Sequence, residues 1–372
     1  MNGAWAIGLV VLIWTGGGAC DGGTAQPVRD TGEGEGEDAS ADTGGGVDAD
    51  TGGGVDEGET ESLVACQGAV VAMTVVRELP YVRVGVDGAE GYFLVDWGTT
   101  GSAIDAAGFA PFAPAPLAGT NNRWADFLFF GPWGTVTLSP QDFSWFADPI
   151  RQAGILGTDF LSLNTFVVDW QTGTLARAEA GAGCSDEALR AAGLRPLSTA
   201  GYYARDLGDV DPGVPNIPTI PVRVGDAQAP AQIDTGYDDT LVGPAININR
   251  AFRAAIDDAL LVRAPELDLV LTTCVPGLFE AVAAWRLAAG AALELVGVDD
   301  APVRRFADAI LFVKDTPAGA FQCGGIGTWS TPGAQLGVSF VARGLRKDGL
   351  AWTGGQRAVF DPWRSRVWLP HD

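Results

Sequence analysis

The sequence predicts an all-β chain with a few short helices, built from two halves that repeat one order of elements. In the first half, alternating apolar residues at 81–86 indicate a strand, and a second strand follows at 92–95. The second half repeats this pair with strands at residues 220–224 and 231–233. In both halves the second strand runs directly into an Asp and a turn that contains glycine. Such a duplication favours two similar β-rich units in one chain.

Each half also contains a later apolar strand with a central glycine, and then a closing strand. In the first half these strands are expected at residues 154–161 and 166–170. In the second half they are expected at residues 335–341 and 358–362, and the last one continues to residues 366–369.

Helix is sparse by comparison. Residues 245–261 carry apolar side chains at helical spacing, and short helical turns are expected after Gly157 and around residues 187–192. Because these segments are few, the predicted class remains mainly β.

The N-terminal residues 1–19 predict a signal peptide. They carry no charged side chain, and their apolar run at residues 4–14 is too short to span a bilayer. Cys20 follows Gly-Gly-Ala and resembles the lipidated cysteine of bacterial lipoproteins, although no basic residue precedes the run and no leucine lies three positions before the cysteine. We therefore expect a lipid anchor at Cys20 in the cell envelope, periplasmic or on the outer surface, with ordinary secretion as the alternative.

Residues 20–63 predict a disordered acidic linker. The segment consists mostly of Gly, Asp, Glu, Ala and Thr, and residues 41–48 recur letter for letter at residues 49–56. It has thirteen acidic residues against one basic residue, so it carries about half of the chain's net charge of −23. This charge argues against nucleic acid and anionic membrane surfaces as partners.

Four cysteines remain after the candidate lipidation site. An even number in a secreted chain favours disulfides, and four cysteines allow three pairings. We expect the pairing in which each bridge closes within one half, which joins Cys66 to Cys184 and Cys274 to Cys323. Zinc is a poor alternative and no metal is expected, because His371 is the one histidine and no CxxC spacing occurs.

Asp96 and Asp234 are the candidate catalytic residues, and they lie 138 positions apart. Each follows an apolar strand, and each half has a glycine strand downstream. The Asp-Thr-Gly triplet alone carries no weight, because it also occurs three times in the linker. Two carboxyls held close together share a proton, since both cannot ionise cheaply. One can then accept a proton from water while the other donates one, which is general acid–base hydrolysis.

These elements resemble the pepsin-like, bilobal aspartic proteases over residues 66–372. The second half matches best, because Asp234-Thr235-Gly236 is intact and residues 233–242 are also similar to the single-lobed retroviral proteases. Within the family, the second half looks most like the plant-type and nepenthesin-type branch.

The resemblance implies two β lobes with the active-site cleft between them, an N-terminal lobe at residues 64–190 and a C-terminal lobe at residues 191–372. Each lobe would supply one catalytic Asp. The implied supporting residues are Gly98, Thr99, Thr235 and Gly236. The implied activity is that of an aspartic endopeptidase that hydrolyses an extended peptide or unfolded protein with water, as a monomer and without a cofactor. The family's second-lobe disulfide would join Cys274 and Cys323.

Two positions depart from the family pattern. Trp97 stands where the family has Thr or Ser, whose hydroxyl links the two turns, and Tyr237 replaces a second hydroxyl residue. Thr235 keeps its hydroxyl, and Thr99 matches the hydroxyl that contacts the first Asp. A Trp indole donates but cannot accept a hydrogen bond. The alternative function is therefore a catalytically impaired relative that binds a peptide or protein in the envelope.

Other conspicuous residues have structural interpretations. Asp169 and Asp361 recur at equivalent places and are expected to begin turns, and Asp238 and Asp239 are expected to be turn or surface acids. Most members of one group of aromatic residues are expected in the core, and the group consists of Trp124, Phe127, Phe129, Phe130 and Trp133. A Ser or Cys catalytic triad is not expected, because the one histidine is next to the last residue.

Overall fold

The computed structural model describes residues 67–109, 111–144, 149–178, 184–204, 215–347 and 351–371. The predicted signal peptide, the candidate lipidation site Cys20, the acidic linker and Cys66 lie outside these ranges, so they stay predictions. Within the described ranges, no helix is both long enough and apolar enough to cross a membrane.

One 13-stranded sheet combines the strands of the first half with the last two strands of the chain. Its strands are β1 (Gln67–Val76), β2 (Leu79–Val86), β3 (Ala89–Val95), β4 (Ala103–Ile104), β5 (Arg123–Leu128), β6 (Pro132–Thr137), β7 (Ser139–Pro140), β8 (Gln152–Leu156), β9 (Phe166–Asp169), β10 (Thr174–Ala178), β11 (Leu194–Ser198), β24 (Arg357–Asp361) and β25 (Arg366–Pro370). They follow the order β11-β25-β24-β9-β10-β1-β2-β3-β8-β4-β7, with β5 and β6 branching from β2.

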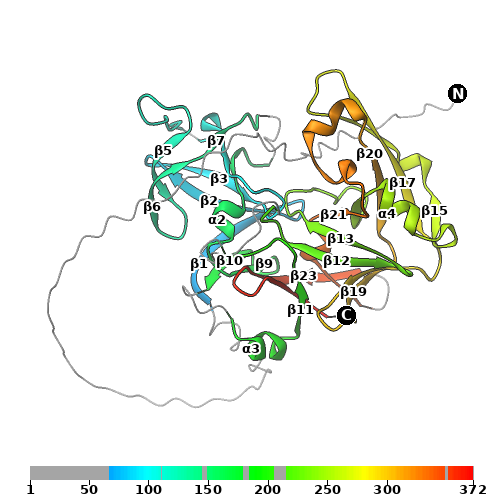
Figure 1. The fold of residues 1–372 in the computed structure, drawn as a ribbon. Coiled ribbons are helices and arrows are strands. Elements are labelled where there is room, and N and C mark those ends of the chain that lie inside the picture. The colour runs from blue at the N-terminus through cyan, green and yellow to red at the C-terminus, as the bar shows by residue number, and fades with distance from the viewer. Residues whose placement is uncertain are drawn as a thin grey trace, which may run out of the picture.

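A second, 10-stranded sheet is built from the second half alone. Its strands are β12 (Thr219–Val224), β13 (Ala227–Ile233), β14 (Ala245–Asn249), β15 (Leu261–Arg263), β16 (Leu269–Thr272), β17 (Phe279–Leu287), β18 (Leu293–Val296), β19 (Pro302–Phe306), β20 (Ile310–Asp315) and β21 (Ala334–Leu336). A separate hairpin joins β22 (Arg343–Lys347) to β23 (Ala351–Gly355). The two large sheets occupy neighbouring halves of the molecule (Figure 1).

The helices are short and connect strands. They are η1 (Ala106–Gly108), α2 (Thr158–Leu161), α3 (Asp186–Ala191), α4 (Arg250–Ala255), η2 (Asp258–Leu260), η3 (Pro265–Leu267), η4 (Ala318–Cys323), η5 (Ile326–Thr328) and α5 (Ser339–Ala342). This content confirms the predicted mainly β class with few short helices. The two predicted helical turns are also confirmed, because α2 follows Gly157 and α3 spans Asp186–Ala191.

The predicted duplication is present in the strand pairing as well as in the order. In the first sheet β3 runs parallel to β8, with Val95 opposite Leu156. In the second sheet β13 runs parallel to β21, with Ile233 opposite Leu336. Asp96 directly follows Val95, and Asp234 directly follows Ile233. The same pairing of parallel strands therefore positions each candidate catalytic Asp.

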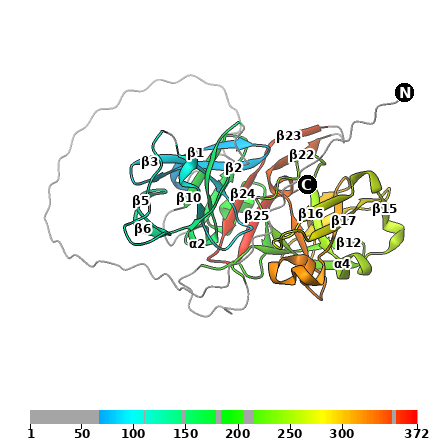
Figure 2. The ribbon, with the colours of Figure 1, turned by 90° about the horizontal axis from the view of Figure 1, so that it is seen from above.

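The last strands cross from the second half of the chain back into the first sheet. β24 pairs with β9, placing Val359 opposite Val167, and β25 pairs with β11, placing Val367 opposite Leu197. In Figure 2 the red strands β24 and β25 lie between the first-half strands and the second sheet. The expected boundary between the lobes at residue 190 therefore does not separate the two sheets, because β11, β24 and β25 follow it in the chain and belong to the first sheet.

The helix predicted over residues 245–261 is only partly present, because Ala245–Asn249 form β14, Arg250–Ala255 form α4, and Leu261 already belongs to β15. Ile246 and Ile248 alternate with Asn247 and Asn249 in β14, a central strand between β20 and β21, and all four side chains are buried. This period of two suits a strand with both faces covered. The side chain of Asn249 then accepts a hydrogen bond from Phe252 N, which begins helix α4.

Two of the cysteines are described well enough to place. Cys184 is fully buried, and Cys184 and Cys274 each take part in a disulfide. Cys66 lies outside the described residues and the side chain of Cys323 is not described, so the expected pairing stays a prediction.

Two smaller clusters aside, the buried apolar residues of both sheets form one continuous cluster. At its centre the ring of Trp97, directly after Asp96, stacks on Phe360 of β24 with 3.8 Å between centroids and 10° between planes. Phe166 of β9 meets the same indole edge-on at 6.3 Å. The C-terminal strand β24 thus packs against the residue that follows a candidate catalytic Asp.

If β24 is integral to this core, Phe360→Ala should lower the free energy of unfolding by about 3–5 kcal/mol, because it leaves a large buried cavity. Phe112→Ala is the matched control, since Phe112 is 77% exposed and its loss should change stability by less than about 0.5 kcal/mol. Urea denaturation followed by tryptophan fluorescence measures both. Equal effects would contradict the placement of β24.

Candidate active site

The two candidate catalytic turns touch each other across the boundary between the sheets. A Cβ added to Gly98, in the first turn, would lie 2.3 Å from Cγ of Asp234. A Cβ added to Gly236, in the second turn, would lie 2.5 Å from Oδ2 of Asp96. Real Cβ atoms do not approach this closely, so each turn needs a glycine where it meets the carboxyl group of the other.

Backbone amides hold the inner oxygens of both carboxyl groups. Gly98 N donates to Oδ1 of Asp96 at 2.7 Å, and Gly236 N donates to Oδ1 of Asp234 at 2.9 Å. Gly236 N also reaches Oδ1 of Asp96 at 3.2 Å, so one N–H lies between the two groups. The structure therefore brings together Asp96 and Asp234, the residues predicted from the sequence.

The hydroxyl of Thr235 crosses from the second turn to the first. It donates to Val95 O at 2.8 Å and accepts from Trp97 N at 3.0 Å. Thr235 is fully buried, and these two bonds satisfy backbone groups on either side of Asp96. The link expected from Thr235 is therefore made.

Trp97 contributes to the core of the first sheet instead of reaching the second turn with its side chain. Its indole Nε1 donates to the hydroxyl of Tyr202 at 3.1 Å, and that hydroxyl donates to Leu161 O at 3.1 Å. Trp97 and Tyr202 are both fully buried. Tyr202 was not predicted, because nothing in its local sequence indicates a partner 105 positions away.

The expected role of Thr99 is not the one that the structure gives it. Its hydroxyl donates to Gly101 O at 3.3 Å instead of contacting Asp96, so it closes the turn locally. Tyr237, at the corresponding place in the second turn, is buried and has its backbone N bonded to Asp234 O at 3.3 Å. Neither residue places a hydroxyl on a candidate catalytic carboxyl group.

A residue that sequence reasoning missed takes that place in the second half. Gln335 of β21 donates from Nε2 to Oδ2 of Asp234 at 2.5 Å, and its Oε1 accepts from Asn247 Nδ2 at 3.1 Å. The available signal was a polar residue directly before Leu336 in an otherwise apolar strand. A buried polar side chain needs a partner, and here the partner is the carboxyl group.

Burial raises the pKa of both carboxyl groups. For Asp96 desolvation is the main cause, and hydrogen bonds from Gly98 N, Asp234 and Gly236 N partly oppose it. For Asp234 desolvation comes first and the charge of Asp96 second, so the pKa of Asp234 lies well above its usual range. Hydrogen bonds from Gly236 N and Gln335 lower it again. The pair therefore retains a proton at pH values where an exposed Asp is ionised.

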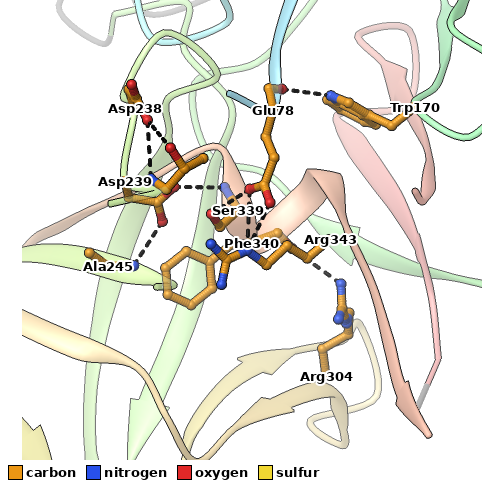
Figure 3. A network of polar contacts seen from close by, with 10 residues as sticks. Glu78, Trp170, Asp238, Asp239, Ala245, Arg304, Ser339, Phe340 and Arg343 are labelled. Carbon is orange, nitrogen blue, oxygen red and sulfur yellow. Dashed lines mark hydrogen bonds and ion pairs between the residues drawn. The ribbon is translucent and has the colours of Figure 1, made fainter. Parts of the chain in front are cut away.

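A second buried carboxyl group lies next to this turn. Asp239 accepts hydrogen bonds from Ala245 N at 2.8 Å and Ser339 N at 3.0 Å, and it is 2% exposed (Figure 3). Asp239 begins a turn as one of its two interpretations expected, since Val242 N donates to Asp239 O at 3.2 Å. The surface interpretation is wrong, because its carboxyl group supports backbone amides inside the fold. Desolvation raises the pKa of Asp239 from 3.8 to about 7.

Figure 3 also shows how the first sheet reaches this region. Glu78, in the turn between β1 and β2, accepts from the Ser339 hydroxyl at 2.6 Å and from Arg343 Nε at 3.0 Å. Ser339 thereby contacts Asp239 through its backbone and Glu78 through its side chain. This network fastens the second turn to the first sheet.

The remaining structural interpretations are confirmed. Asp169 accepts from Gln171 N and Asp361 accepts from Trp363 N, so both carboxyl groups begin turns. Three of the aromatic residues expected in the core are buried there, whereas Phe130 and Trp133 are partly buried and packed against it. The buried residues are Trp124, Phe127 and Phe129.

In the described part of the chain, no cluster of three His, Cys, Asp or Glu side chains could hold a metal ion. A scan against models of known protein families finds no match to this chain. A search of curated proteins likewise finds no matching relative.

We predict that Gly98→Ala and Gly236→Ala each lower the free energy of unfolding by about 3 kcal/mol or more, because the new methyl group overlaps the opposite carboxyl group. Gly101→Ala is the matched control in the same region, since a Cβ there meets open space. Its effect should stay within about 0.5 kcal/mol. Chemical denaturation compares the three variants, and a Gly98→Ala protein as stable as Gly101→Ala would show that the turns do not meet.

Asp239 should make the protein less stable as pH rises. Its folded pKa of about 7 exceeds its ordinary value of 3.8, so its contribution is complete below about pH 4 and is lost as pH rises through 7. The resulting loss is about 4 kcal/mol. In Asp239→Asn, urea unfolding from pH 4 to 8 should show a flatter pH dependence on a lower baseline, because the two N–H groups bond to different carboxyl oxygens and an NH2 group replaces one of them. The exposed control Asp226→Asn should keep the wild-type slope, and an equal slope in Asp239→Asn would refute the assignment.

Proposed function

We propose that the protein is an aspartic endopeptidase that uses Asp96 and Asp234. The observation that carries the proposal is the reciprocal contact of the two turns, in which Gly236 N donates to Oδ1 of both carboxyl groups. Two carboxyl groups that are 6% and 5% exposed cannot both be charged without a large desolvation cost. A pair that shares one proton is the arrangement that peptide hydrolysis by activated water requires.

In the proposed reaction, a water molecule lies between the two carboxyl groups. The ionised carboxylate removes a proton from the water, which then attacks the carbonyl carbon of the peptide bond. The protonated carboxyl group donates a hydrogen bond to the carbonyl oxygen as negative charge develops there. The leaving amine receives a proton from the pair as the C–N bond breaks, which regenerates one ionised and one protonated group. Two neighbouring Asp carboxyl groups that share one proton are the known pattern of aspartic proteases as a class, and this pair fits it.

The proposed architecture is the bilobal, pepsin-like one, with the substrate cleft between the lobes. The repeated parallel pairings of β3 with β8 and of β13 with β21 support it, because each places one Asp at the end of an equivalent strand. An extended peptide in such a cleft would bind largely through backbone hydrogen bonds. We further propose a monomer that is attached to the cell envelope through Cys20, with secretion as the alternative.

The second candidate function is a peptide- or protein-binding module that has lost catalysis. The observation in its favour is Trp97, whose indole bonds to Tyr202 and leaves the first turn without a side-chain hydroxyl for the second. The two functions differ in what the carboxyl groups do, because binding through a groove needs no proton transfer.

Cleavage of an unfolded, fluorescently labelled protein between pH 3 and 7 tests the proposal. Asp96→Asn and Asp234→Asn should each reduce cleavage by at least about 100-fold, since each removes a group that transfers protons. Asp226→Asn, in the exposed turn between β12 and β13, is the control and should cleave like the wild type.

Undiminished cleavage by either active-site variant would refute the assignment. A wild type that binds the unfolded protein without cleaving it, with the same affinity in both variants, would establish the binding module instead. Circular dichroism of each variant separates loss of activity from loss of folding.

A further inference from the structure

Gln335 lies where it can control the charge on Asp234. Its amide Nε2 donates to Oδ2 of Asp234 at 2.5 Å, on the opposite side of the carboxyl group from Oδ1, which accepts from Gly236 N. The Gln335 side chain is 8% exposed and comes from β21, whose residues are all buried. A rigid strand inside the sheet therefore presents a donor to the carboxyl group.

Asn247 fixes the direction of this amide. Its Nδ2 donates to Oε1 of Gln335 at 3.1 Å, which leaves the Gln335 amide nitrogen to face Asp234. Asn247 is fully buried, and among the described residues no donor reaches its Oδ1. A buried polar atom without a hydrogen bond costs free energy. Asn247 carries this cost at Oδ1 while its Nδ2 holds Gln335, which indicates that Asn247 positions the Gln335 amide.

In the described strands of the first sheet, the register position that corresponds to Gln335 carries no amide. In β21, Gln335 lies opposite Gln232 of β13. The next pair along the two strands is Ile233 with Leu336, and Asp234 follows Ile233. The matching register in the first sheet places Ile155 of β8 opposite Leu94 of β3. The apolar Ile155 thus occupies in the first sheet the register position that Gln335 occupies in the second, so this position offers a side-chain donor in one half and none in the other.

We propose that Gln335, oriented by Asn247, is a positioning residue that holds Oδ2 of Asp234 and stabilises the ionised state of the aspartate pair. This inference rests on the proposed function, because it concerns the same two carboxyl groups. The amide keeps one donor on the outer side of Asp234, so the shared proton remains on the side that faces Asp96. A donor to a carboxylate favours its charged form, which opposes the desolvation of the pair.

The test is a titration of the full-length protein labelled with 13C at the Asp carboxyl carbons. Asp96→Asn and Asp234→Asn assign the two signals. In Gln335→Met, Asp234 should take up its proton at a pH higher by about one unit or more, because a donor to a buried carboxylate is lost. Asn247→Leu should move the titration in the same direction by a smaller amount, since the amide is then present but no longer oriented.

Gln152→Met is the matched control. Gln152 is a buried glutamine at the start of β8, and its Oε1 accepts from Tyr81 OH at 3.3 Å instead of facing a carboxyl group. Its replacement should lower stability without moving the titration of the pair. If Gln335→Met and Asn247→Leu behave like this control, Gln335 is merely structural and the inference is overturned. Should Gln335→Met fail to fold, Asn247→Leu decides the question by the same criterion.

The titration also separates this inference from the proposed function. A shifted titration in a protein that cleaves nothing would support the role of Gln335 and refute the peptidase. In an active enzyme, the alkaline side of the cleavage–pH profile should shift upward with the titration in Gln335→Met, because it reports the proton held by Asp234. An active enzyme whose profile and titration are both unmoved would refute the role of Gln335 and leave the peptidase intact.

Discussion

One backbone N–H lies between two buried carboxyl groups, and the rest of the molecule is arranged around this contact. Gly236 donates to Oδ1 of Asp234 at 2.9 Å and to Oδ1 of Asp96 at 3.2 Å. For both bonds to exist, two turns from different sheets must meet with no side chain between them, which Gly98 and Gly236 permit. The same closeness removes water from the carboxyl groups and makes a shared proton the favourable state.

The two halves hold this contact by different means, although their strands repeat. Thr235 reaches across to the backbone on both sides of Asp96, whereas Trp97 turns into the core and stacks on Phe360. The side chain after Asp234 thus links the two turns by hydrogen bonds, whereas the side chain after Asp96 packs in the core. This division explains how a bulky indole fits next to a candidate catalytic Asp without separating the turns. It also makes the C-terminal strands part of the support for the site.

The sequence predicted the elements that local pattern determines. The strands before Asp96 and Asp234 follow from alternation of apolar residues, and the strand–Asp–glycine order predicted which carboxyl groups meet. It did not predict the partners of Trp97 and Asp234, because Tyr202 and Gln335 lie 105 and 101 positions away from them and are brought in by the fold. The helix expected at residues 245–261 is replaced in its first part by strand β14, because the apolar spacing of a strand with both faces buried does not distinguish it from a buried helix.

The position of the shared proton is the most direct test of this account. Neutron diffraction from perdeuterated crystals grown near pH 5 would locate the deuterium atoms on Asp96 and Asp234. The account predicts a single deuterium on the pair, on an oxygen that faces the other carboxyl group. Two fully ionised carboxylates, or two side chains that point away from each other into separate parts of the fold, would contradict it.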